Sequence, residues 1–168
     1  MLIVSPLHRV PGVVAEFGAS RVMGLLGPDT EHPDVGLPED QHLRMTFNDI
    51  SVPMSGMVPP GEDHVKAIID FIEDWDHSGR FVIHCWAGIS RSTASAFITQ
   101  CLLNPQEEEI DLAWELRHLA PSATPNRLIV EHADRLLRRD GRMVSAIKAI
   151  GRGVEAWEGD VFQWDVRK

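Results

Sequence analysis

The first half of the chain consists of short apolar runs separated by turns. Three of these runs, residues 1–4, 21–26 and 42–47, are predicted to be β-strands because each is short, apolar and bounded by turn residues. The segment 27–41 between the last two is rich in proline, glycine and acidic residues. It is therefore predicted to be a loop.

From residue 61 the apolar positions change from short runs to a helical period. An apolar stripe with i, i+3, i+4, i+7 spacing predicts an amphipathic helix that ends near residues 78–79: Val65, Ile68, Ile69, Ile72 and Trp75. The next run, Phe81–Cys85, reads FVIHC and contains no Asp, Glu, Lys or Arg. Such a run is typical of a strand that is buried on both faces of a parallel sheet.

Helical spacing returns after this strand and continues to about residue 150. A further apolar stripe predicts one helix, which should end before Pro105. The stripe consists of Ala94, Phe97, Ile98, Cys101 and Leu102. Three more helices are predicted at about residues 107–119, 126–139 and 143–150. Residues 151–168 have no clear period, so we expect either an irregular tail or a segment that docks on the body.

The order of these elements predicts the fold class. Strands alternate with helices early in the chain and helices follow later, which indicates a three-layer α/β fold. Its central sheet should be short, mostly parallel and flanked by helices. Neither a linker nor an internal repeat divides the sequence, so residues 1–168 are expected to form a single domain.

Composition narrows the classes of function. The 168 residues carry a formal net charge of −9, which disfavours a nucleic-acid partner. No apolar run reaches the roughly 20 residues that span a bilayer, and the first residues lack the basic start of a signal peptide, so we expect a cytoplasmic location without membrane insertion. The two cysteines, Cys85 and Cys101, are too few and too far apart for a disulfide framework or a zinc site.

The segment from His84 to Thr93 combines several features of a phosphate-binding site. It runs from the end of a buried strand through a short loop into a predicted helix. Amides of such a loop and the helix N-terminus favour a bound dianion, and they equally favour the thiolate of a cysteine placed there. Gly88 would let the backbone turn inward where a Cβ would crowd the phosphate. Arg91 offers a planar fork that matches two phosphate oxygens.

The sequence HCWAGISRS, residues 84–92, resembles the signature of the protein tyrosine and dual-specificity phosphatases. That signature is His-Cys, five residues, Arg, and then Ser or Thr. A fainter resemblance lies in Arg117, Pro121 and Asn126, which are similar to the Arg…Pro-Asn stretch ahead of a late helix in dual-specificity phosphatases. The resemblance implies the cysteine-phosphatase fold and a catalytic domain of this kind.

The resemblance also implies a role for each residue of the motif. Cys85 would attack phosphorus and form a cysteinyl-phosphate, Ser92 would stabilise the sulfur as it leaves, and His84 would orient the loop without touching substrate. Phosphate would be held by Arg91 and by the loop residues Trp86, Ala87, Gly88, Ile89 and Ser90. Neither a metal nor another cofactor is required.

The family further needs an acid that protonates the leaving oxygen, usually an Asp some thirty to forty positions before the cysteine. Asp49 falls in that window, just after a predicted strand. A simple turn role for Asp49 stays open, because Asp is frequent in turns. Five other acidic residues stay open as alternatives for the acid: Glu62, Asp63, Asp29, Asp34 and Asp40. Glu62 and Asp63 are also explained by their place at a predicted helix start.

The sequence constrains the branch of the phosphatase family and the substrate less than it constrains the motif residues. The chain has no Trp-Pro-Asp sequence and no tyrosine, so the compact dual-specificity branch fits better than the larger tyrosine-specific enzymes. We expect a phosphomonoester hydrolase acting on a phosphorylated protein or a small phosphomonoester. One alternative is a catalytically weak phosphate-binding module, but such modules usually lack the Cys or the Arg, and this chain has both. The other is a phosphoinositide phosphatase, but these enzymes often have lysines within the loop, and this chain has none there.

Overall fold

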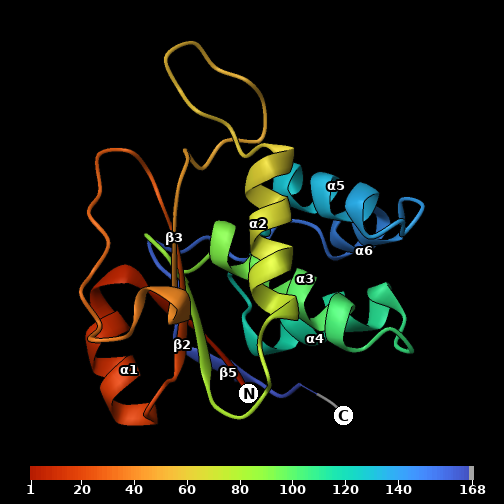
Figure 1. The fold of residues 1–168 in the computed structure, drawn as a ribbon. Helices are drawn as coiled ribbons and strands as arrows, with labels where there is room; N and C mark the ends of the chain where they lie inside the picture. The colour runs from red at the N-terminus through yellow and green to blue at the C-terminus, as the bar shows by residue number, and fades with distance from the viewer. Residues whose placement is uncertain (167–168) are drawn as a thin grey trace.

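A five-stranded sheet forms the centre of the protein, which was studied as a computed structural model that describes residues 1–166 (Figure 1). The strands follow the order β3-β2-β4-β1-β5 across the sheet. Their bounds are Leu2–Pro6 for β1, Arg21–Leu26 for β2, His42–Thr46 for β3, Phe81–Cys85 for β4 and Phe162–Trp164 for β5. β1 to β4 are parallel, and β5 pairs antiparallel with β1. The predicted α/β fold with a mostly parallel sheet is confirmed.

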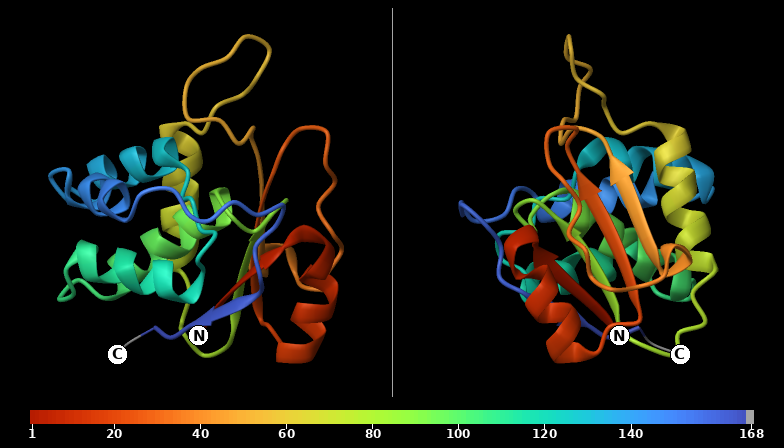
Figure 2. Two further views of the ribbon diagram at one scale, coloured as in Figure 1. Left: turned by 180° about the vertical axis from the view of Figure 1, so that it is seen from behind. Right: turned by 60° about the vertical axis from the view of Figure 1, so that its left-hand side comes forward.

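Helices cover both faces of this sheet unequally. Helix α1, Val10–Phe17, lies alone on one face, and the other helices lie on the opposite face (Figures 1 and 2). These are α2 (Glu62–Glu73), α3 (Arg91–Leu103), α4 (Glu109–Leu119), α5 (Arg127–Leu136) and α6 (Arg142–Ile150). Within residues 1–166 none of the helices has the length and apolar character needed to cross a bilayer.

Helix α3 is the centre of the larger core. All its residues from Arg91 to Cys101 are buried, including the polar side chains at its start. It packs between the sheet and the surrounding helices, with Phe97 and Ile98 in the main apolar cluster. A smaller apolar cluster fills the space between α1 and the sheet. The start of α3 is therefore held rigidly at the carboxyl end of β4.

The structure adds one helix that the sequence pattern does not predict. Residues 10–17 include Pro11 and Gly12, which normally mark a turn. Proline is nevertheless tolerated in the first turn of a helix, where its missing N–H has no partner to lose. Burial of Val10, Val13 and Val14 against the sheet stabilises α1.

Helix α5 is shorter than the predicted 126–139. Its chain leaves the helical path after Leu136, and Arg138 and Asp140 both adopt positive φ angles, of 53° and 51°. Asp134 accounts for this turn, because its carboxylate accepts hydrogen bonds from the amides of Gly141 and Met143 at the start of α6. Helix α2 ends at Glu73, five residues before the predicted end near residues 78–79, and the bounds of the other predicted elements differ by at most about two residues.

The segment after α6 docks on the body. Residues 151–161, which we call the strap, have no helix or strand and lead into β5. Trp164 on β5 is 1% exposed and anchors this part of the chain, whereas Trp157 on the strap is 84% exposed. Residues 167–168 of the predicted tail lie outside the described residues.

Candidate active site

The loop that links β4 to α3 carries the candidate nucleophile at its start. Cys85 ends β4, a strand that lies between β2 and β1 near the middle of the sheet. Its side chain is buried, and its Sγ lies 3.1 Å from the Oγ of Ser92 in the first turn of α3. Cys85 and Ser92, which the sequence motif groups together, are thus in direct contact.

The loop is held open by hydrogen bonds to its outer side. Four of its carbonyls accept from backbone amides of other segments: Trp86 from Leu7 (3.1 Å), Ala87 from Gly159 (2.8 Å), Ile89 from Thr124 (2.9 Å) and Ser90 from Asn126 (3.2 Å). Among the hydrogen bonds of residues 1–166, none has an amide of residues 86–90 as its donor. Successive free N–H groups at the start of a helix form a concavity that binds anions.

Arg91 stands at the first position of α3 with its charge buried. It is 5% exposed, and its Nη1 donates to the carbonyl of Phe47 at 2.9 Å. Its Nε has no hydrogen-bond partner within residues 1–166 and lies 3.7 Å from Oδ2 of Asp49. A buried guanidinium with so few partners is unfavourable by itself. A phosphate dianion in the concavity would supply the missing acceptors.

Asp49 is brought next to the same loop, although it lies far away in the sequence. Its Oδ1 accepts hydrogen bonds from Ser90 Oγ at 2.7 Å and from Asn126 Nδ2 at 2.8 Å. About a third of its side chain is exposed (33%). Oδ1 is thus engaged twice, whereas Oδ2 has only the longer contact with Arg91 Nε at 3.7 Å.

Asn126, which the sequence analysis named only as part of a faint resemblance, links α5 to Asp49. Its Oδ1 accepts from the amides of Leu128 and Ile129, so it caps α5, while its Nδ2 donates to Asp49. Its backbone amide also donates to the carbonyl of Ser90. An Asn at a helix start predicts a cap, but neither this signal nor the resemblance predicts the contact with Asp49.

The acidic residues that were open as alternatives lie elsewhere. Glu62 and Asp63 occupy the first turn of α2, as expected for a helix start. Asp34 accepts from the amide of Gly36 within its own loop, and Asp40 from the side chain of Gln41. In the part of the chain that the structure describes, neither these four nor Asp29 has a hydrogen bond or ion pair to residues 84–92. Only Asp49 among the six contacts the loop.

His84 is separated from the other motif residues by the sheet itself. Neighbouring residues of a strand point to opposite faces. Cys85 belongs to the cluster on the α3 face, and the His84 ring packs against His32 on the opposite face. Burial is the main cause that lowers the pKa of His84 to about 3, with His32 and His42 acting in the same direction.

Gly88 has a second reason to be glycine, which the sequence did not reveal. It has a φ of +71°, and a Cβ there would lie 2.9 Å from the backbone nitrogen of Pro6. A side chain would therefore crowd β1. Both the positive φ and the close approach to β1 favour glycine.

We expect Gly88→Ala to lower the free energy of unfolding by more than the ~1–2 kcal/mol of a left-handed backbone alone. Urea unfolding of the purified variant would measure this. Gly36→Ala is the matched control, because Gly36 has a φ of +69° but nothing within 4 Å of the added Cβ. Equal losses in the two variants would show that the contact with Pro6 costs nothing.

Exposed apolar side chains border the loop. The rings of Trp86 and Trp157 pack edge to face with 6.2 Å between their centroids, and Trp86 is 48% exposed. Beyond Asp49, residues 51–58 form a loop that projects from the body (Figures 1 and 2). Its exposed apolar residues are Val52, Met54, Met57 and Val58. The approach to the concavity is therefore apolar on two sides.

Comparison with known proteins finds similarity in structure but not in sequence. No protein-family model matches the chain, and no curated protein matches it by sequence.

Solved structures match over most of the chain. The human tyrosine phosphatase-like serine/threonine/tyrosine-interacting protein has a TM-score of 0.62 at 16% identity, covering 83% of this chain and 92% of that one. DUSP15 matches with a TM-score of 0.58 at 19% identity over 89% of each chain. PTPMT1, solved in complex with PI(5)P, matches with a TM-score of 0.57 at 13% identity over 83% of this chain and 94% of that one.

At these identities the similarity is one of fold. It covers more than four fifths of the chain in each case. The chain has the fold of the protein tyrosine and dual-specificity phosphatases.

Proposed function

We propose that the protein is a cysteine-dependent phosphomonoester hydrolase of the protein tyrosine and dual-specificity phosphatase type. One observation carries this proposal: a single loop at the start of a helix holds a cysteine in contact with Ser92, a buried arginine, and backbone amides that donate no hydrogen bond within residues 1–166. A nucleophile opposite preorganised donors is the arrangement that phosphoryl transfer requires. The shared fold supports it.

In the first half of the proposed reaction the Cys85 thiolate attacks phosphorus in line with the bond to the leaving oxygen. The S–P bond forms as the P–O bond breaks, and Arg91 and the loop amides hold the other three oxygens. The leaving oxygen takes its electron pair and accepts a proton from Oδ2 of Asp49. The products of this step are the alcohol and a cysteinyl-phosphate.

In the second half water attacks the phosphorus of the intermediate. The Asp49 carboxylate takes one proton from this water, and the S–P bond breaks with its electrons returning to sulfur. Ser92 is 3.1 Å from that sulfur, so its hydroxyl can donate a hydrogen bond to the departing thiolate. Inorganic phosphate leaves and the thiolate is regenerated.

Phosphorylated protein is the substrate class that the site supports best. The apolar side chains beside the loop offer contact area for residues that flank a phosphorylated side chain. PTPMT1 binds PI(5)P, which keeps a phosphoinositide substrate as the second candidate. The loop between Cys85 and Arg91 contains no lysine to bind further phosphate groups, and this disfavours that candidate.

A phosphate-binding module without turnover is the competing function. One structural match is a tyrosine phosphatase-like interacting protein, so the fold alone does not decide between the two. The contact of Cys85 with Ser92 and that of Asp49 with Ser90 favour hydrolysis, because binding alone would need neither.

Phosphate release decides between these functions. The assay compares phosphotyrosine and phosphoserine peptides with phosphoinositides at equal concentration, using the unaltered chain. We expect release from the peptides, and release from phosphoinositides alone would favour the second candidate. Binding of the peptides without release by the unaltered chain would leave only the binding module.

The two cysteines are expected to differ strongly in reactivity. Cys85 should be alkylated by iodoacetate at pH 6 at least about tenfold faster than Cys101, since Cys85 precedes a helix start and its free loop amides, whereas Cys101 lies inside a helix. Burial raises the pKa of the Cys101 thiol, which keeps it protonated and inert. Peptide mapping after timed labelling gives both rates. Inorganic phosphate should protect Cys85, and equal labelling would contradict the assignment.

A further inference from the structure

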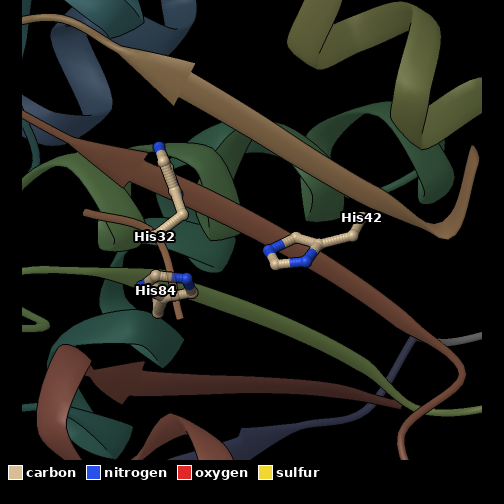
Figure 3. Close-up of side chains that lie close together, drawn as sticks. All are labelled: His32, His42 and His84. Atoms are coloured by element: carbon tan, nitrogen blue, oxygen red, sulfur yellow. The ribbon is translucent and has the colours of Figure 1, made fainter. Parts of the chain in front are cut away.

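Three histidines from separate parts of the chain converge on the sheet face opposite Cys85. His32 comes from the loop 27–41, His42 from the start of β3 and His84 from β4 (Figure 3). Each histidine contributes one ring nitrogen to a set of three, and these three nitrogens lie within 4.8 Å of one another. The function proposed above makes no use of this cluster.

The register of the sheet brings the three rings together. β2 runs between β3 and β4, with Val22 opposite His42 and Gly24 opposite His84. Because positions 22 and 24 share a face of the sheet, His42 and His84 point to the same side. The missing side chain of Gly24 leaves the space between them, which His32 enters from the loop above.

Gly24 defines the point on which the nitrogens converge. A Cβ on Gly24 would lie 2.6 Å from Nδ1 of His32 and 2.7 Å from Nε2 of His84. The two nitrogens therefore lie over Gly24, in a space that the side chain of any other residue would enter. A zinc–nitrogen bond is about 2.0–2.1 Å long, so modest ring movements would let a cation bind between the rings, farther from the Gly24 Cα than a Cβ would be.

All six ring nitrogens of the cluster are buried, and none makes a hydrogen bond of normal geometry within residues 1–166. Only weak interactions with the backbones of Met45 and Cys85 reach the rings of His32 and His84. His42 is 2% exposed and His84 is fully buried. Buried polar groups in proteins are nearly always paired, because an unpaired one costs free energy. A neutral imidazole has one nitrogen with a free lone pair, and one nitrogen of each ring lies within 4.8 Å of those of the other two, so the three together can bind one electron-pair acceptor.

We propose that His32, His42 and His84 bind a divalent transition-metal cation, zinc being the ion that fits best. Neutral imidazoles suit zinc and its neighbours in the series, whereas magnesium and calcium take oxygen ligands, which the cluster does not offer. A histidine with its ordinary pKa is mostly neutral at pH 7, so each ring has one lone pair available.

The bound ion would be structural rather than part of the phosphoryl transfer. It would tie the loop 27–41 to β3 and β4, and its ligand His84 directly precedes Cys85 in the chain. Because the His84 ring lies on the face away from Cys85, the ion would not touch a substrate in the concavity. Three protein ligands leave a fourth position for water.

Zinc binding can be measured without reference to activity. Because a thiolate also binds zinc, the Cys85→Ser chain is used throughout, loaded with zinc chloride and dialysed before metal analysis and calorimetry. We expect about one zinc per chain. Even outer-shell changes cost 10–100-fold in metal affinity, so loss of a direct ligand in His32→Ala should cost at least about 100-fold.

Two further variants make the result specific. His118→Ala is the control, since His118 is exposed on α4 and contacts only the carbonyl of Trp114 in its own helix; it should bind zinc as the parent does. Gly24→Ala fills the space between the rings and should also abolish binding. Circular dichroism and urea unfolding show that each variant is folded, and His32, in a loop and only partly buried, can be replaced with the least risk.

The outcomes separate a metal site from a cluster that merely holds water. Retention of zinc by the parent and by His118→Ala, with its loss in His32→Ala, would support the proposal. Either no zinc in the dialysed parent or equal zinc in folded His32→Ala would overturn it. Neither result depends on whether the protein hydrolyses phosphomonoesters.

Discussion

Cys85→Ser is expected to abolish phosphate release while leaving binding of vanadate or phosphate intact. Serine has nearly the same shape, but its hydroxyl is far from ionised at neutral pH and is a poor nucleophile. Removal of a catalytic nucleophile in other hydrolases lowers kcat by roughly 10⁶-fold, and a loss of that order is expected here. Calorimetry with vanadate and a phosphate-release assay measure the two properties separately.

Arg91→Ala, by contrast, should lose both binding and turnover. The guanidinium is the one buried cation that faces the concavity within residues 84–92, and the loop amides alone supply only partial charges. Arg127→Ala is the matched control, because Arg127 is 74% exposed and pairs with Glu131 on α5. Normal turnover by Cys85→Ser would refute the whole catalytic assignment, and unchanged binding by Arg91→Ala would refute its second part.

Asp49→Asn should reduce activity in proportion to how much the leaving group needs a proton. A tyrosine side chain has a pKa near 10, so its expulsion as an anion is costly. A general acid typically contributes about 10²–10⁴-fold, and activity on phosphotyrosine should fall by that factor. A fluorinated coumarin phosphate, whose leaving group is stable as an anion, should lose far less. The ratio of kcat/KM for the two substrates is the measurement.

The substitution is a clean test because of how Asp49 is held. An Asn retains an oxygen that can accept from Ser90 and Asn126, so the loop keeps both hydrogen bonds. Asp63→Asn and Glu62→Gln, at the start of α2, should show only the small effect of a changed first-turn charge. If one of these showed the dependence on leaving group and Asp49→Asn did not, the acid would be misassigned while Cys85 kept its role.

The parts of the structure that could be predicted are those that depend on local sequence. β2 and β4 have the bounds expected from their apolar runs, and the loop after β4 begins where Cys85 ends the strand. A strand that is buried on both faces of a parallel sheet needs a continuous apolar run, which is visible in the local sequence. The start of a helix is also marked by residues within its first turn. The position of Cys85 relative to Ser92 follows from this local geometry, and the structure has them in contact.

The parts that could not be predicted depend on contacts between distant segments. The link from Asn126 to Asp49 joins residues that are 77 positions apart, and the approach of His32 to His84 depends on the register of β2 against β4. β5 is only three residues long and is defined by its pairing with β1 rather than by a pattern of its own. The local sequence around either residue of such a pair does not indicate that the two residues are in contact.

The hydrogen bond from Gly159 to Ala87 has a consequence for the order of events during synthesis. One of the four amides that hold the phosphate-binding loop open comes from the strap, which leaves the ribosome after all of α3 to α6. β5, whose Trp164 secures the strap on the body, follows later still. A nascent chain that has completed α6 therefore has its nucleophile and arginine but not yet the full cradle. If the loop binds phosphate as proposed, this capacity is complete only after the strap has been synthesised and has docked, later than α3 to α6.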